Sequence, residues 1–132
     1  MRVFLDTNVL VSATATRGLC ADALREVLIS HQLVISVTVI EELQHTLRTK
    51  FGVPQDIIAE LIEFLKKEAL ISAPGNVPDI KLQDKSDLII LSSAINGKAD
   101  LFITGDRELL DLQKFGAMEI ISPRMFWEKL KA

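Results

Sequence analysis

The sequence predicts a single α/β domain over residues 1–132, built as a three-layer α/β/α sandwich around a parallel sheet of about five strands. Two observations support this class. Short apolar runs of strand length alternate with longer segments of helical periodicity, which is typical of a parallel sheet with helical crossovers. The length also suits one domain, and no repeat or low-complexity tract divides the chain.

The first half of the chain contains two predicted strands and three predicted helices. The strands are 2–5 and 33–36, and the helices are 20–30, a segment from about 37 onward, and 55–68. Ser36 and Thr38 are both suitable N-caps for the middle helix, Thr38 because Glu41 three residues later would complete a capping box. Gly52 and Pro54 then separate this helix from the next.

The second half continues the alternation after a loop at 73–83. The predicted strands are 70–72, 101–103 and 119–121, and the predicted helices are 86–96, 106–114 and 123–131. The helix 86–96 is apolar on most sides and should therefore be buried. Gly97 follows it as the expected left-handed C′ residue.

Composition narrows the class of protein. The net charge of −3 argues mildly against a plain nucleic-acid-binding module, and the 5% aromatic content argues against a base-stacking platform. One cysteine excludes an intrachain disulfide, which suits a reducing cytoplasm. We find no targeting segment and no apolar run long enough to cross a membrane.

Acidic residues follow four of the predicted segments at places that share one edge of a parallel sheet. They are Asp6, the pair Glu41 and Glu42, the pair Asp84 and Asp87, and Asp106. Two carboxylates about 4 Å apart repel by roughly 4 kcal/mol at an effective dielectric constant near 20. Such a group must take up protons or hold a cation, and carboxylates favour Mg²⁺ or Mn²⁺. Metal-assisted phosphodiester hydrolysis is the chemistry that this predicts.

Each acid also has a simpler interpretation when taken alone. Asp84 and Asp106 could be helix N-caps. Glu41 or Glu42 could be a first-turn acid that the helix dipole stabilises. Caps need only one acid per helix, however, and they need not converge. Asp6 directly follows a buried strand, where an unpaired charge is costly.

These residues resemble the PIN-domain family over nearly the whole chain. Four motifs in order carry the resemblance: VFLDTN at 3–8, Ser36 followed by Glu42, Asp87 opening the helix that contains Ser93, and TGD at 104–106. The family consists of small Mg²⁺- or Mn²⁺-dependent ribonucleases, and many bacterial and archaeal members are the toxin halves of toxin–antitoxin pairs. The resemblance therefore implies a PIN-like fold and an RNA substrate.

The resemblance also implies roles for individual residues. Asp6, Glu42, Asp87 and Asp106 would be the catalytic and metal-binding acids, with Asn8, Ser36 and Thr104 as supporting polar residues. Asp84 either reaches the metal or only caps its helix, since Lys85 stands where toxin-like members often have proline. Glu42 is chosen over Glu41 from the motif. A cognate antitoxin and a homodimer are further expectations.

Three basic residues lie near the proposed edge in the sequence, namely Arg17, Lys85 and Arg107. They are candidates for contacts with RNA phosphates, although each could equally be a solvated surface charge.

Other functions fit the sequence less well. A phosphatase of the haloacid-dehalogenase type needs a second Asp where this chain has Asn8, and a response-regulator receiver needs adjacent acids near the first strand. A PIN-like adaptor that binds RNA or protein without cleaving is the alternative from another class. The retained acids argue against this adaptor.

Overall fold

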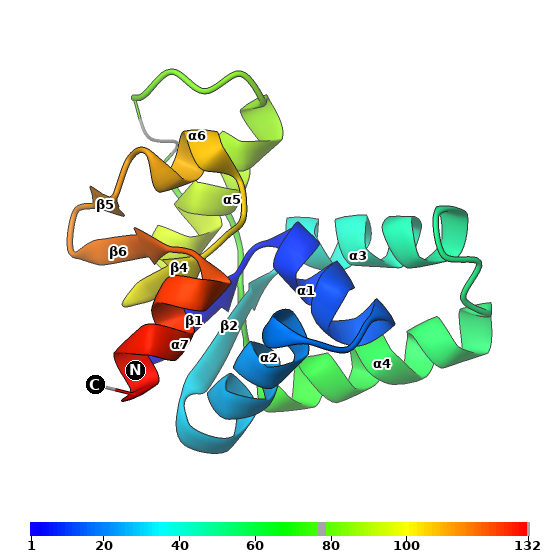
Figure 1. Ribbon diagram of the computed structural model, residues 1–132. Coiled ribbons are helices and arrows are strands. Elements are labelled where there is room, and N and C mark those ends of the chain that lie inside the picture. Colours follow the sequence, from blue (N-terminus) through cyan, green and yellow to red (C-terminus); the bar gives the residue numbers. More distant parts are fainter. Residues whose placement is uncertain (77–78, 132) are drawn as a thin grey trace.

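The computed structural model describes residues 1–76 and 79–131, and its centre is a largely parallel sheet (Figure 1). The strands run in the order β3-β2-β1-β4-β6-β5. Their bounds are Arg2–Leu5 for β1, Gln32–Ser36 for β2, Leu70–Ser72 for β3, Leu101–Ile103 for β4, Lys114–Phe115 for β5 and Met118–Ile121 for β6. All pairings are parallel except that of β5 with β6. The predicted α/β class with a mostly parallel sheet is confirmed.

Seven helices in the described part of the chain surround this sheet. They are α1 Thr7–Ala15, α2 Leu19–Ser30, α3 Val37–Thr49, α4 Gln55–Glu68, α5 Lys85–Asn96, α6 Arg107–Leu110 and α7 Pro123–Lys131. α2 packs against α1 and α7, and α5 packs against β2 and β3. The chain reverses direction across the sheet between β3 and β4, so a right-handed crossover places α5 on the face opposite α1 and α2. α3 and α4 extend away from the strands (Figure 1).

The central strands are buried on both faces, as parallel strands between helical layers must be. Val3, Phe4 and Leu5 of β1 are fully buried, and the rings of Phe4 and Phe102 stack with centroids 5.1 Å apart. Burial of one such side chain contributes about 1.5–3 kcal/mol relative to exposure. The register pairs Leu5 with Ile103, so the residues that follow these strands emerge side by side at the same edge of the sheet.

The structure contains one helix that the sequence analysis did not anticipate. α1 begins at Thr7, directly after Asp6, which is its N-cap. No helix was predicted after residue 6, because residues such as Asp, Thr and Asn favour turns as well as helix N-caps. No helix in the described residues has the length and apolar character of a membrane span.

The predicted helix 106–114 is wrong beyond its first turn. α6 ends at Leu110, and Gln113 adopts a left-handed backbone with φ of 62°. The chain then forms the short antiparallel strand β5, which reverses at Gly116 to pair with β6. This hairpin adds a sixth strand to the five that were expected.

Gly97 ends α5, but not for the reason that its position suggested. Its φ is −79°, and the following residue Lys98 takes the left-handed conformation with φ of 57°. A Cβ on Gly97 would lie 2.7 Å from Val34 Cγ1 and 3.1 Å from Ser72 Cβ. The glycine therefore permits close approach of the helix end to β2 and β3.

We predict that Gly97→Ala destabilises the protein by about 1–3 kcal/mol, because the added carbon overpacks against the sheet. Chemical denaturation measures this change in the free energy of unfolding. Gly105→Ala is the matched control, since a Cβ there meets nothing within 4 Å. Equal stabilities of the Gly97 variant and the wild type would contradict the proposed close packing.

Candidate active site

Asp6 is held rigidly at the carboxyl end of β1. Its backbone N–H donates to the carbonyl of Ile103 at 2.9 Å, which continues the pairing of β1 with β4. Its carboxylate accepts from the backbone N–H of Thr7 at 2.8 Å and from Thr104 Oγ1 at 2.7 Å. The residue is only 6% exposed. Asp6 thus presents a nearly buried carboxylate whose orientation is fixed by two donors.

Thr104 joins the ends of β1 and β4 through one hydroxyl group. Besides donating to Asp6, Thr104 Oγ1 accepts from the backbone N–H of Asp106 at 3.0 Å. The Asp106 carboxylate in turn accepts from the backbone N–H of Glu108 at 2.8 Å and caps α6. Thr104 is fully buried. A single buried threonine therefore sets the positions of two acidic residues.

Glu42 reaches the same region from α3. The helix begins at Ser36, whose buried hydroxyl accepts from the backbone N–H of Val39 at 3.1 Å. The Glu42 carboxylate then accepts a hydrogen bond from Thr7 Oγ1 of α1. Glu41 is exposed and is not among the residues that line the pocket. Of the two neighbouring glutamates, the structure places Glu42 beside the other acids, and Ser36 rather than Thr38 is the cap.

The start of α5 contributes two further aspartates. Asp84 caps the helix by accepting from the backbone N–H of Ser86 at 2.9 Å, and its own carbonyl accepts from the backbone N–H of Asp87 at 3.2 Å. Gln83, just before the cap, donates its backbone N–H to both carboxylate oxygens of Glu108, at 3.1 and 3.3 Å. This contact connects the loop before α5 to α6.

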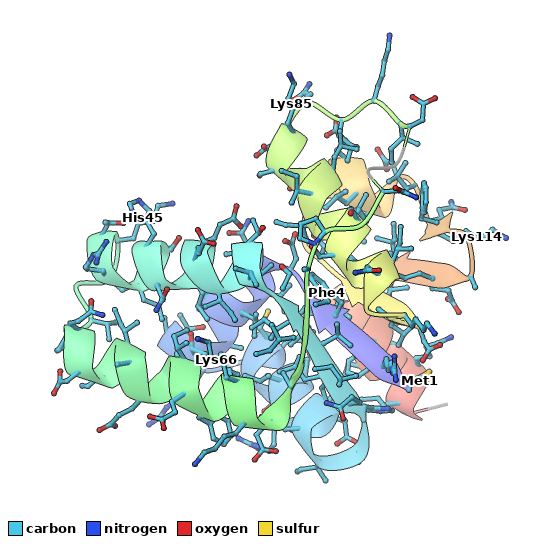
Figure 2. The ribbon with its side chains drawn as sticks, turned by 180° about the vertical axis from the view of Figure 1, so that it is seen from behind. Met1, Phe4, His45, Lys66, Lys85 and Lys114 are labelled. Atoms are coloured by element: carbon cyan, nitrogen blue, oxygen red, sulfur yellow. The ribbon has the colours of Figure 1, made fainter. Side chains whose placement is uncertain are left out.

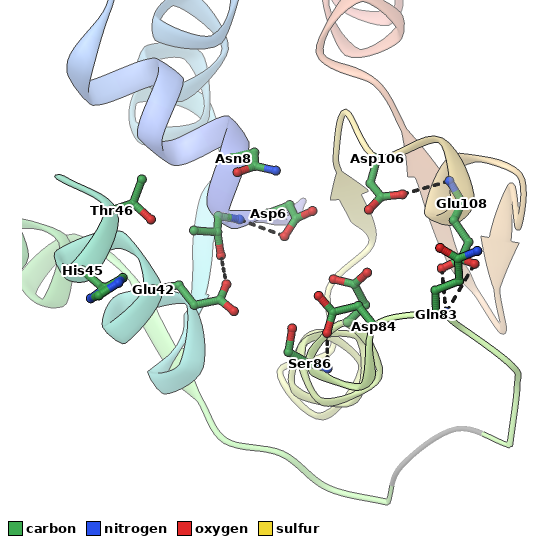
Figure 3. A pocket seen from close by; sticks show the side chains of 12 residues that line it. Asp6, Asn8, Glu42, His45, Thr46, Gln83, Asp84, Ser86, Asp106 and Glu108 are labelled. Atoms are coloured by element: carbon green, nitrogen blue, oxygen red, sulfur yellow. Dashed lines mark hydrogen bonds between the residues drawn. The ribbon is translucent and has the colours of Figure 1, made fainter. Parts of the chain in front are cut away.

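These side chains line one pocket with a volume of about 420 Å³ (Figure 3). The acids in its lining are Asp6, Glu42, Asp84, Asp87, Asp106 and Glu108, and the other residues are Thr7, Asn8, His45, Thr46, Gln83 and Ser86. They come from α1, α3, α5 and α6 and from the residues just before α1, α5 and α6, and Figure 3 shows the labelled side chains around a common space. Among the described lining residues, His45 is the only one whose side chain can carry a positive charge.

The crowding of acids changes their proton affinities. Burial raises the pKa of Asp6, two hydrogen bonds from Thr104 and Thr7 oppose that rise, and the charges of Glu42 and Asp106 add to it. Burial followed by the charges of Asp6 and Asp106 raises the pKa of Asp87 to about 7. The N–H and hydroxyl of Ser86 instead lower the pKa of exposed Asp84. The raised pKa values mean that Asp6 and Asp87 each favour binding a proton or a cation over standing as a free carboxylate.

The residues present fit a hard divalent cation. The carboxylate oxygens are the ligands that Mg²⁺ and Mn²⁺ prefer. The raised pKa values reflect burial and, after it, the charges of the neighbouring acids, and a cation would offset both. Within the described residues no three acidic, histidine or cysteine side chains are close enough to surround an ion directly. Mg²⁺ usually keeps several of its waters, so it can bind between carboxylates that do not touch one another.

The predicted basic residues lie outside this pocket. Arg17, Lys85 and Arg107 are all exposed, and none belongs to the described lining. The sequence analysis missed other residues that do line it. His45 follows Glu42 by three positions and so shares its helix face, a spacing that could have identified it. No sequence spacing identifies Gln83 and Glu108, because they lie 25 residues apart and meet only through the fold of the loop before α5.

Comparisons with known proteins identify the family of this chain. The family model described as PIN domain matches residues 2–108, so the chain belongs to the PIN-domain family. The chain has no significant match among curated protein sequences.

Two solved structures share the fold. One is VapBC2 from Rickettsia felis bound to a DNA fragment from its promoter, with a TM-score of 0.62 and 15% identity over 92% of this chain and 98% of that one. The other is VapBC-1 from nontypeable Haemophilus influenzae, with a TM-score of 0.60 and 21% identity over 84% of this chain and 91% of that one. At these identities the similarity shows the fold.

We predict that Asp87→Asn stabilises the metal-free protein at pH 8 by about 1 kcal/mol, as is common when a functional site carries destabilising charge. The folded pKa near 7 lies above the unfolded value near 3.9, so the folded state binds more protons between these values. The wild type therefore loses stability as the pH rises from about 4 to 7, and the variant does not.

Denaturation in EDTA at pH 5 and pH 8 measures this difference. Glu60→Gln removes an exposed acid from α4 and serves as the matched control, with an expected change below about 0.5 kcal/mol. A stability difference between Asp87→Asn and the wild type that is the same at both pH values would rule out charge repulsion as its cause.

Proposed function

We propose that the protein is a Mg²⁺- or Mn²⁺-dependent endoribonuclease and the toxin of a toxin–antitoxin pair. One observation carries the proposal. Asp6, Glu42, Asp87 and Asp106 come from four separate segments, and they line one pocket at the carboxyl edge of the sheet. In open α/β sheets this edge, where the strand order switches between β1 and β4, is where ligands bind.

The four acids would hold the metal, in part through the waters that it keeps, and Asp84 would add a further carboxylate while it caps α5. When bound, the cation supplies positive charge against the phosphate and lowers the pKa of an attacking water. Hydrolysis would leave a 3′-hydroxyl and a 5′-phosphate.

The supporting residues keep the acids in place. Thr104 orients Asp6 and fixes the backbone of Asp106, while Ser36 starts the helix that carries Glu42. Asn8 is exposed and lines the pocket, where its amide can contact the substrate. These hydrogen bonds fix the orientation of the carboxylates that would meet the metal and the substrate.

RNA and an antitoxin are the partners that this function requires. Arg17, Lys85 and Arg107 are exposed, and each lies near residues of the pocket in the sequence. We assign these three side chains to contacts with RNA phosphates. The two similar structures are VapBC proteins, which supports a cognate antitoxin. We further propose a homodimer that works in the cytoplasm.

We predict that the purified protein cleaves RNA with Mn²⁺ or Mg²⁺ and not with EDTA. Asp106→Asn should lower the cleavage rate at least about 100-fold, since loss even of groups that only orient metal ligands costs about 10–100-fold. Asparagine is as good an N-cap as aspartate, so α6 remains capped. Gel analysis of labelled RNA measures the rate.

Asp111→Asn removes an exposed acid at the other end of the same helix and should cleave like the wild type. RNA binding without cleavage by the wild type, with either metal, would identify the protein as an adaptor instead. Equal cleavage by the wild type and Asp106→Asn would remove Asp106 from the mechanism.

A further inference from the structure

A second hollow of different chemical character lies beside the acidic pocket. It is formed by the end of the loop before α5 and the first turns of that helix, and its volume is also about 420 Å³. The two hollows share Gln83 and Glu108 in their linings. A ligand in one therefore lies next to a ligand in the other.

The surface of this second hollow is aliphatic. Ile80 and Leu82 approach from the loop and Leu88 from α5, and all three are half-buried. Half-buried aliphatic side chains at an open surface leave apolar area that a flat ring could cover, with a gain of about 25 cal/mol per Å². Among the described residues, no aromatic side chain lines this hollow, so aliphatic contact takes the place of aromatic stacking here.

Two lysines border the aliphatic surface. Lys81 lies in the loop and Lys85 is the first residue of α5, and both are exposed (Figure 2 labels Lys85). The two ion pairs in the described part of the chain involve neither lysine. Their charges are thus available to an anion at the rim, in contrast to the acidic lining of the first pocket.

The wall between the two hollows is firmly held. The backbone N–H of Gln83 donates to the Glu108 carboxylate, and Asp106 caps the helix that carries Glu108. The Gln83 backbone is therefore tied to the helix that follows β4. Its side-chain amide offers two donors and one acceptor, which is what the edge of a nucleobase requires.

We propose that this second hollow binds one nucleobase of the RNA, next to the phosphodiester that is cleaved in the acidic pocket. Leu82 and Leu88 contact the face of the base, and Lys81 and Lys85 contact phosphates on either side of it. This base site rests on the proposed ribonuclease function, and it would let the enzyme prefer one base at a fixed position beside the cleaved bond. An apolar surface, two unpaired cations and continuity with the cleavage pocket favour RNA over a protein segment, which would not need phosphate contacts.

Cleavage of a random-sequence RNA pool tests the contact with the base. Sequencing of the products should show a base preference at one fixed position beside the cleaved bond. Leu88→Ala should weaken that preference about fivefold, since the truncation removes part of the apolar surface that contacts the base. Ile89→Ala, the neighbouring exposed residue outside the hollow, is the matched control and should leave the preference unchanged.

The lysines are tested by the salt dependence of RNA binding. The double variant Lys81→Gln with Lys85→Gln should lower the slope of log affinity against log salt by about 1.4, or 0.7 for each lost phosphate contact. Lys66→Gln with Lys67→Gln makes the same change of charge on α4 and should leave the slope unchanged (Figure 2 labels Lys66).

Photo-crosslinking separates this proposal from the ribonuclease function. RNA containing 4-thiouridine should crosslink within residues 80–88 in the presence of Mn²⁺. Crosslinks there without cleavage would support the base site and overturn only the nuclease. Cleavage with no crosslink in 80–88, or with the same base preference in the wild type and Leu88→Ala, would overturn the base site. So would protection of this segment by a protein partner when RNA gives no crosslink.

Discussion

The pairing of β1 with β4 is the constraint on which the site depends. It places Asp6 beside Thr104, and the hydrogen bond between their side chains holds a nearly buried carboxylate in one orientation. The same threonine hydroxyl accepts from the backbone of Asp106. A buried carboxylate without such donors would be strongly unfavourable. The core packing of Phe4 against Phe102 fixes this register, so hydrophobic burial in the sheet determines where two of the acids lie.

The acids are held together at a cost in stability that the rest of the fold offsets. The raised pKa values of Asp6 and Asp87 express this cost, since each reflects burial and the nearby charges of other acids. Sites that bind cations or perform acid–base chemistry commonly show such shifts. The helix caps limit the cost, because Asp6, Asp84 and Asp106 each accept a backbone N–H at the start of a helix. Capping and cation binding are thus compatible roles of the same residues.

Much of the fold follows from local pattern, and the failures have physical causes. The strand 2–5 coincides with β1 because it is a short apolar run, and the helix 55–68 coincides with α4 because its apolar periodicity is strong. α1 was missed because its capping residue Asp6 also ends a strand, and the helix predicted at 106–114 continued too far because β5 has only two residues. Local sequence cannot specify a hairpin that depends on pairing with β6.

Five of the six acids in the pocket could be predicted from the sequence, since parallel strands align their carboxyl ends and each of the five follows a strand or lies near the start of a helix. They are Asp6, Glu42, Asp84, Asp87 and Asp106. His45, Gln83 and Glu108 were not found. His45 could have been found from its spacing of three residues after Glu42, but the contact of Gln83 with Glu108 joins residues that are distant in the chain. The choice between Glu41 and Glu42 came from a motif, and it corresponds in the structure to the hydrogen bond that Thr7 donates to Glu42.

We propose that these carboxylates converge on a bound divalent cation. Anomalous diffraction from crystals soaked in Mn²⁺ would locate such an ion. We expect a manganese peak in the acidic pocket, with carboxylate oxygens of Asp6 and Asp106 at the coordination distance of about 2.1 Å that hard cations of this size require. An empty pocket at saturating Mn²⁺, or a peak at any other place on the protein alone, would contradict it.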